Sequence, residues 1–160
     1  MAKPPSYSPE GLALLGAPTL ARLVFGEAER NANFKRLAKA ALAGAKGPDA
    51  VAKLVDRRLT SLEKAEGRIG WRRSRAFRDD LDSSLRAITD ELGALSADLA
   101  GERLLRFLGL ADRVMRRTDD PSGRIRAVFA DGAGASADLA RRMGEPERGA
   151  LAGDLVRALD

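Results

Sequence analysis

The stretch FRDDLDSSLRAITDELGAL, residues 77–95, decides the fold class of this chain. Its apolar residues follow one another at spacings of 4, 4, 3, 4 and 3: Phe77, Leu81, Leu85, Ile88, Leu92 and Leu95. Side chains three and four positions apart lie on the same face of an α-helix, so the pattern predicts an amphipathic helix. We expect this helix to begin at Trp71 or Ser74 and to extend to Leu92.

Upstream of this stretch, start signals and apolar stripes predict four further helices. Ser8-Pro9-Glu10 combines an N-cap serine with a first-turn proline, and Gly47-Pro48-Asp49 opens a helix in the same style. Between them, one helix is expected from Pro18 or Thr19 and another over residues 34–42, where apolar residues recur at helical spacing. The helix after Gly47 carries an apolar face from Val51 to Leu62.

Downstream, Ser96 is the expected N-cap of a helix that continues as far as Asp119. The apolar face of that helix is predicted to be Leu99, Leu104, Leu108, Ala111 and Met115, with Leu105 and Val114 alongside. Asp120 and Pro121 then have the arrangement of an N-cap and a first helical residue, which predicts the start of the next helix.

Residues 132–137, GAGASA, match the dinucleotide-binding pattern in its final-alanine form. That motif belongs to a parallel sheet, and we predict no strands to build one. We therefore interpret these glycines as a kinked or locally disordered stretch between two helical segments. The last amphipathic face is Leu151, Leu155, Val156 and Leu159. No glycine or proline stops this helix, so we expect the natural protein to continue beyond Asp160.

Together these elements predict an all-α fold of stacked antiparallel helical hairpins, a degenerate repeat array of the tetratricopeptide or HEAT type. Residues 1–8 are expected to form a flexible N-terminal lead and residues 9–160 a single α-helical domain. Aromatic residues are only 4% of the chain, so the core has to be built mainly from leucine, alanine and valine.

The chain contains neither cysteine nor histidine. This composition excludes disulfides, thiolate nucleophiles and cysteine-based zinc sites, and it removes the commonest general base. Asp119 and Asp120 lack the further ligand spacing of a calcium loop. We therefore expect no catalytic, cofactor-binding or metal-binding residues, no cofactor and no enzymatic activity. A cluster of carboxylates formed in space is the one route to an enzyme that the sequence leaves open.

The balance of charge is basic, with 28 Lys and Arg residues against 23 Asp and Glu residues. Acidic residues are interleaved with arginine along most of the chain, so the excess of +5 fits either an arginine-rich genome composition or an acidic partner. The N-terminus has no apolar segment typical of a signal peptide, and no apolar run approaches the ~20 residues of a membrane span. We expect a cytoplasmic protein without a membrane partner.

Four stretches carry a resemblance to a known family: residues 47–62, residues 69–76 (IGWRRSRA), residues 79–82 (DDLD), and residues 105–108 (LRFL) leading to DDPSGR at 119–124. Over most of residues 10–160 the chain resembles an uncharacterised family of bacterial helical proteins. It is also similar to the helical region that follows the zinc-chelating motif in SWIM-type zinc-finger proteins. The resemblance implies a tetratricopeptide-like helical array, longer family members and no assigned activity. The zinc-chelating motif is absent here, so zinc binding does not transfer.

The most basic segment spans residues 64–78, where six cationic residues accompany one acidic residue. Its candidates for binding an anion or a partner are Trp71, Arg72, Arg73 and Arg75. Arginine can donate to phosphate oxygens, and an indole can stack on a base. The structural alternative is that Trp71 packs in the core while the arginines are solvated or paired with the acids of residues 79–82.

A second candidate group consists of Arg106, Arg113 and Arg117, which are 7 and 4 residues apart. This spacing predicts that they share one face of the helix that begins after Ser96. They either line a groove for an acidic peptide or nucleic-acid backbone, or form the solvated face opposite the apolar stripe. Arg113 and Arg117 near the helix C-terminus would also interact favourably with the helix dipole.

Two classes of binding function remain from these observations. The leading hypothesis is a non-enzymatic interaction or scaffold module that binds a protein or peptide on a concave face of the array. The alternative is a basic helical module that contacts the nucleic-acid backbone through its arginine-rich faces. The alternative requires the two arginine groups to form one continuous surface. The identity of the partner and the oligomeric state stay open.

Overall fold

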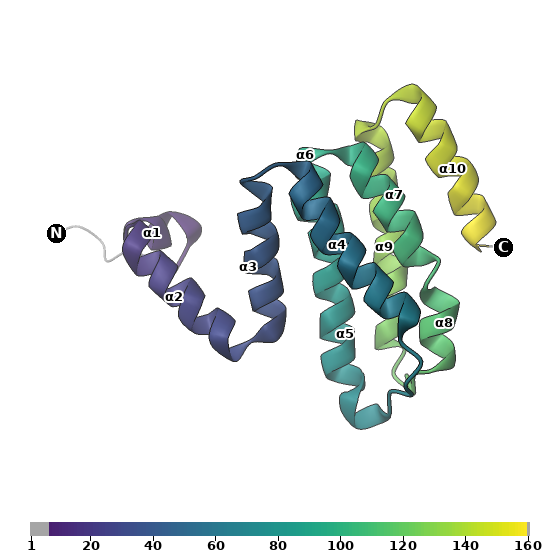
Figure 1. The fold of residues 1–160 in the computed structure, drawn as a ribbon, viewed down its shortest axis with the longest axis horizontal. Helices are drawn as coiled ribbons and strands as arrows, with labels where there is room; N and C mark the ends of the chain where they lie inside the picture. Colours follow the sequence, from purple (N-terminus) through teal and green to yellow (C-terminus); the bar gives the residue numbers. More distant parts are fainter. Residues whose placement is uncertain (1–6, 160) are drawn as a thin grey trace.

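The computed structural model describes residues 7–159, except for the side chains of Pro146 and of residues 155–159. The described part of the chain is all-helical and contains no β-strand, so the predicted fold class is confirmed (Figure 1). At its N-terminal end lie α1 (Pro9–Ala13), α2 (Ala17–Arg30) and α3 (Ala32–Gly44). The predicted flexible lead falls largely on residues 1–6, which lie outside the described residues.

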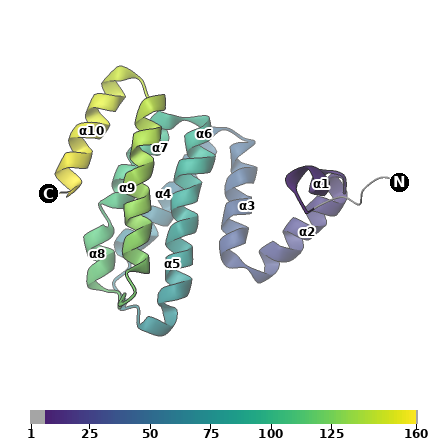
Figure 2. The same ribbon diagram turned by 180° about the vertical axis from the view of Figure 1, so that it is seen from behind.

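The remaining elements form a bundle around the main core. In chain order they are α4 (Pro48–Lys64), α5 (Trp71–Arg86), the π-helix η1 (Ala87–Leu92), α6 (Gly93–Leu95), α7 (Ala97–Leu108), α8 (Ala111–Arg116), α9 (Arg124–Arg142) and α10 (Glu145–Leu159). Helix α9 packs on both α5 and α7, α4 crosses α7 and η1, and α10 lies along α7 (Figures 1 and 2). The short chain before α5 is tied to the end of α8 by a single β-bridge between Ile69 and Thr118.

The predicted helix over residues 71–92 is confirmed, with its last six residues in the wider π form. Leu81, Ile88 and Leu92 of its stripe are fully buried, whereas Leu95 lies at the exposed end. The expected N-caps are also present: the hydroxyl oxygens of Ser8 and Ser96 accept from the backbone N–H groups of Gly11 and Leu99, at 3.1 and 3.3 Å.

The prediction of one continuous helix from residue 97 to residue 118 is wrong, because the helix ends at Leu108 and restarts at Ala111. The break changes which side chains face inward. Leu110 and Val114 enter the core, while Met115 of the predicted stripe is only partly buried. Phe107, which the predicted face omitted, is fully buried and stacks on Phe129 with ring centroids 5.0 Å apart.

The start of α9 differs from the predicted cap. Pro121 lies in the preceding turn, and Gly123 occupies the N-cap position with a positive φ of 66° that favours glycine. The Asp120 carboxylate still performs the capping role, since it accepts from the backbone N–H groups of residues 124, 125 and 126 at 2.9–3.2 Å. Three of the free N–H groups in the first turn of α9 are thereby satisfied.

The interpretation of residues 132–137 as a kinked or disordered stretch is also wrong, because α9 runs through them without a break. Gly132 is buried, and a Cβ placed on it would lie 3.3 Å from side-chain carbons of Leu85 and Leu108. The glycine therefore allows α9 to approach α5 and α7 closely. At the other end of the bundle, buried Leu151 of α10 packs near Gly101 of α7, while the predicted face residues Leu155, Val156 and Leu159 lie outside the described side chains.

Helices α1 and α2 stand apart from the bundle. α2 continues through Gly26 to Arg30, turns at Asn31 and packs chiefly against α3, which in turn packs on α4 and α5 (Figures 1 and 2). The Asn31 side chain caps α3 by accepting from the backbone N–H groups of residues 33 and 34, both at 3.1 Å. This N-terminal hairpin therefore presents one side of both helices to solvent.

Candidate functional site

Trp71 is the first residue of α5, and its side chain is 68% exposed. The expectation that it packs in the core is therefore wrong. The apolar stripe of α5 begins six residues later, at Phe77, so Trp71 precedes the part of the helix that packs on the core. The guanidinium carbon of Arg72 lies 5.3 Å from the centre of the indole ring, within range of a cation–π contact.

The arginines of this segment are solvated or paired, as the structural alternative expected: Arg72, Arg73 and Arg75 are exposed, and Arg78 pairs with Asp79. The other acids of residues 79–82 pair elsewhere: Asp82 with Arg86, and Asp80 with both Arg36 and Arg58. Arg73 donates to the backbone carbonyl of Arg68 at 2.8 Å. Within residues 7–159 no acidic side chain pairs with Arg72 or Arg75, so this end of α5 presents positive charge next to an exposed indole.

Arg106 is occupied by contacts inside the protein. Its Nε and Nη2 donate to the two carboxylate oxygens of Glu63 at 2.6 and 2.8 Å, and its Nη1 donates to Asp56 at 3.2 Å. The hydrogen bond from Arg106 is the main cause that lowers the pKa of the Glu63 carboxyl. This forked pairing joins α7 to α4, which gives Arg106 a structural role.

Arg113 and Arg117 do not share a helix face with Arg106, because the helix break at residues 109–110 separates them. Arg113 is exposed on α8. Arg117 lies over the ring of Phe77 at 5.3 Å and donates to the carbonyl of Gly67 at 3.0 Å. Burial, followed by the charge of Arg113, lowers the pKa of Arg117. The structure therefore does not bring the two predicted arginine groups into one open surface.

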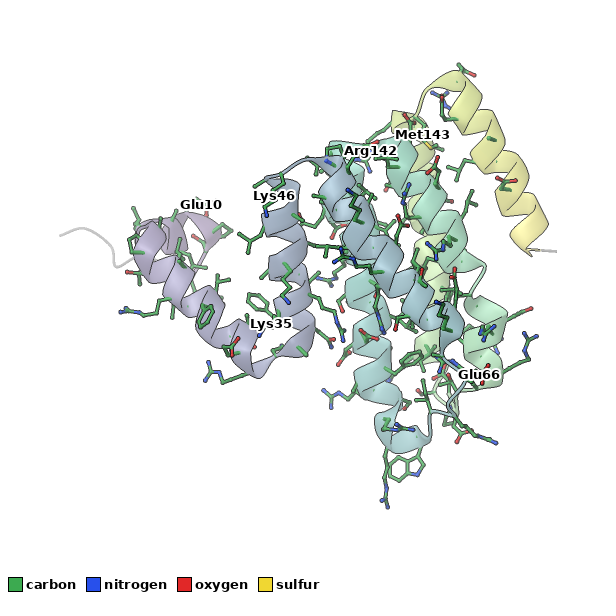
Figure 3. The ribbon with its side chains drawn as sticks, viewed as in Figure 1. Glu10, Lys35, Lys46, Glu66, Arg142 and Met143 are labelled. Atoms are coloured by element: carbon green, nitrogen blue, oxygen red, sulfur yellow. The ribbon has the colours of Figure 1, made fainter. Side chains whose placement is uncertain are left out.

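An apolar groove that the sequence analysis did not identify runs between α2 and α3. It has a volume of about 600 Å³ and is lined by Leu20, Ala21, Val24, Phe25, Ala28, Glu29, Lys35, Ala38, Lys39, Ala41, Leu42 and Ala45. Phe25 and Leu42 are 68% and 70% exposed. Glu29 and Lys35 form an ion pair of 2.6 Å, and Figure 3 places Lys35 near the turn between the two helices. The groove is thus closed by charge at one end and apolar along its walls.

A sequence signal for this groove exists in α2. Leu23, Val24 and Phe25 are consecutive, and three consecutive residues of a helix span about 200° of its circumference. One neighbouring helix covers less than that, so part of the apolar surface has to stay uncovered unless a second neighbour packs there. Large apolar side chains left on a surface in this way mark interaction sites more often than scattered single ones do.

Asp80 is the centre of a charge cluster between α3, α4 and α5. The residue is 8% exposed, and its two carboxylate oxygens each accept from one guanidinium, Oδ1 from Arg36 and Oδ2 from Arg58. Burial is the main cause that lowers the pKa of Arg58, followed by the charges of Arg36 and Arg117. Two cations therefore share one buried anion.

Among the described side chains there is no group of three or more acidic, histidine or cysteine residues arranged to hold a metal ion. The two predicted neighbours Asp119 and Asp120 have separate roles, one pairing with Arg68 at 3.0 Å and the other capping α9. No helix in the described part of the chain is both long enough and apolar enough to cross a membrane.

The fold and this groove define an all-helical protein with an open apolar surface on its N-terminal hairpin. The chain belongs to the Family of unknown function (DUF6880), whose model matches residues 2–160. The expected membership of an uncharacterised family is thereby confirmed, while the likeness to SWIM-type proteins and the bacterial origin stay predictions. No curated protein and no solved structure matches the chain.

Proposed function

We propose that this protein is a non-enzymatic interaction module that binds a helical segment of another protein in the groove between α2 and α3. The observation that carries the proposal is the exposure of Phe25 and Leu42, which line this groove from opposite helices. Burying such side chains against a partner removes apolar surface from water, worth about 25 cal/mol per Å² before the costs of association.

The shape and charge of the groove favour one kind of occupant, an amphipathic α-helix with acidic flanks. Two helices that form an open apolar channel accept the apolar face of a third, which presents residues at i, i+3, i+4 and i+7. The charged lining residues are two lysines and one glutamate, and Glu29 is already paired with Lys35. The excess positive charge, contributed by Lys39, is complementary to a partner with acidic residues beside its apolar face.

The test is a selection from a displayed library of acidic amphipathic helices, about 15 residues long. We expect binders with micromolar affinity, and we expect Leu42→Glu to weaken them at least about tenfold because it places a charge against the apolar face. Leu14→Glu is the matched control: Leu14 is equally exposed but does not line the groove. The Leu14→Glu variant should bind the selected helices with the affinity of the wild type.

The proposed site is refuted if the selected helices bind the Leu42→Glu variant of the protein as tightly as the Leu14→Glu variant. The oligomeric state of the isolated protein provides a second check. A dimer that forms with rising concentration and is dissociated by Leu42→Glu would assign the groove to a second copy of the chain instead of a foreign helix. Light scattering after gel filtration distinguishes the two outcomes.

We also propose that the N-terminal part of the chain is a degenerate array of the tetratricopeptide or HEAT type. The packing of α2 on α3 and of α3 on α4 supports this, because helices in such arrays pack mainly on their neighbours in the chain. In such arrays the terminal hairpin has one side without a neighbour, as α2 has here. A cytoplasmic location would suit a partner-binding role and stays a prediction.

A second candidate function rests on the exposed indole of Trp71. Arg72 lies over the indole, and Arg73 and Arg75 are nearby. The start of α5 therefore offers an aromatic surface on which a base can stack and guanidinium groups that can donate to phosphate oxygens, as in proteins that bind single-stranded nucleic acid. This surface excludes Arg106, which is held by Glu63.

Fluorescence anisotropy of labelled single-stranded and duplex DNA and RNA, at about 50 and 200 mM salt, tests this candidate. If it holds, we expect binding that weakens steeply with salt, and a loss of about tenfold or more for Trp71→Ala. The double variant Arg72→Ala/Arg73→Ala should lower the affinity further than Arg22→Ala/Arg57→Ala, which removes the same charge elsewhere. Equal effects of the two double variants would identify nonspecific attraction.

A further inference from the structure

A second, smaller cavity lies on the other side of α3 from the groove. It has a volume of about 120 Å³ and is lined from α3, α4, α5 and η1 by Arg36, Lys39, Ala40, Leu54, Val55, Arg58, Leu59, Ser83, Ser84 and Ala87. Arg36 and Lys39 come from α3, Arg58 from α4, and the serines from α5. The cavity therefore lies where the N-terminal hairpin meets the bundle.

The charges around this cavity are unbalanced. Three cations and no acidic residue belong to its lining. The nearest paired acid, Asp80, does not line the cavity and is already shared between Arg36 and Arg58. In addition, the Nε of Arg58 is buried and has no hydrogen-bond acceptor among the described residues. A buried donor without an acceptor is unfavourable by about 1–3 kcal/mol in general, so this guanidinium makes fewer hydrogen bonds than its five donors allow.

The walls of the cavity are apolar below this cationic rim. Leu59 and Val55 are buried aliphatic side chains, and Ala40 and Ala87 leave the space that larger residues would fill. The hydroxyls of Ser83 and Ser84 donate to backbone carbonyls of α5, at 2.8 Å each, so they add little polarity. The volume corresponds to that of about four water molecules. A small anion with a short hydrocarbon part fits these dimensions better than a bare inorganic ion.

The backbone provides a further indication at the same place. The π-helix η1 begins at Ala87, one of the lining residues, directly after the last turn of α5. Single π-helical turns of this kind occur frequently at functional sites, because the wider turn repositions side chains and backbone groups.

We propose that this cavity binds a small aliphatic monocarboxylate. The carboxylate lies against Arg36, Arg58 and Lys39, and the hydrocarbon tail lies against Leu54, Val55 and Ala87. A guanidinium has five donors, so Arg36 and Arg58 can each keep Asp80 and still donate to a second carboxylate. The proposal does not rest on the helix-binding function of the groove, although Lys39 lines both sites.

Titration of the full chain with sodium butyrate, at constant ionic strength maintained with sodium chloride, tests the proposal. The readout is the set of methyl NMR shifts of the alanine, valine and leucine residues. We expect saturable shifts confined to the cavity, with a Kd near 1 mM. From acetate to butyrate the affinity should rise about threefold to fourfold for each added CH₂ group, and it should fall again for octanoate, which exceeds the cavity.

Two variants distinguish specific binding of butyrate in the cavity from nonspecific attraction of an anion to a basic protein. Lys39→Met keeps the aliphatic stem and removes the charge, and we expect it to weaken butyrate about threefold to fivefold. Lys53→Met, on the exposed side of α4, should leave the affinity unchanged. The inference is overturned if butyrate gives no saturable shifts, if phosphate or chloride competes as well as butyrate does, or if tail length has no effect.

Discussion

Phe107→Ala is expected to lower the free energy of unfolding by about 3–5 kcal/mol, because it removes a fully buried aromatic ring and leaves a cavity. The ring stacks on Phe129 and lies where α7 meets α9, the two helices with the most extensive mutual packing. The side chains of the surrounding core are themselves tightly buried, so they can collapse into the space only in part. Urea denaturation followed by circular dichroism measures the effect.

Phe25→Ala is the matched control, since it removes the same ring from a site that is 68% exposed. We expect its change in unfolding free energy to stay within about 0.5 kcal/mol. If the two variants unfolded at similar urea concentrations, the core would not be centred on the contact between α7 and α9.

Asp80→Asn is expected to destabilise the protein by about 2–3 kcal/mol, somewhat less than the ~3–5 kcal/mol of breaking a fully buried ion pair. The substitution keeps the shape of the side chain, yet it leaves the guanidiniums of Arg36 and Arg58 without their anion. Both guanidiniums retain some contact with solvent, and this contact limits the loss. Thermal and chemical denaturation at neutral pH both report it.

The adjacent substitution Asp79→Asn tests whether the location of Asp80 matters. Asp79 pairs with Arg78 on the surface, where such pairs contribute about 0–1 kcal/mol. We expect Asp79→Asn to be nearly neutral. A loss for Asp80→Asn no larger than that for Asp79→Asn would contradict the central role assigned to this carboxylate.

The parts of the fold that depend on local rules could be predicted from the sequence. The helix over residues 71–92 follows from the spacing of its own apolar residues, and the caps at Ser8 and Ser96 form within one turn of the chain. Gly109 lies at the break after Leu108, but a single glycine is also tolerated inside a helix, so it does not by itself indicate the break. The break depends on the burial of Leu110 and Val114 against other helices.

The candidate sites depend on contacts between distant parts of the chain, and sequence patterns carry little information about these. Asp80 lies 44 residues after Arg36 and 22 after Arg58, so their meeting follows from how α3, α4 and α5 pack. Trp71 shows the converse case. Its apolar character suggests burial, and only the position of the neighbouring helices shows that nothing covers it.

The attachment of α2 to the rest of the molecule has a consequence for kinetics. Because α2 packs chiefly on α3, its detachment breaks few contacts of the main core, and its amide hydrogens are expected to exchange with solvent faster than those of α7 or α9. The groove exists only while α2 is docked. The apparent affinity for any helix bound there therefore scales with the fraction of time that α2 spends docked. Substitutions that only strengthen the contact between α2 and α3 would then tighten binding without touching the partner.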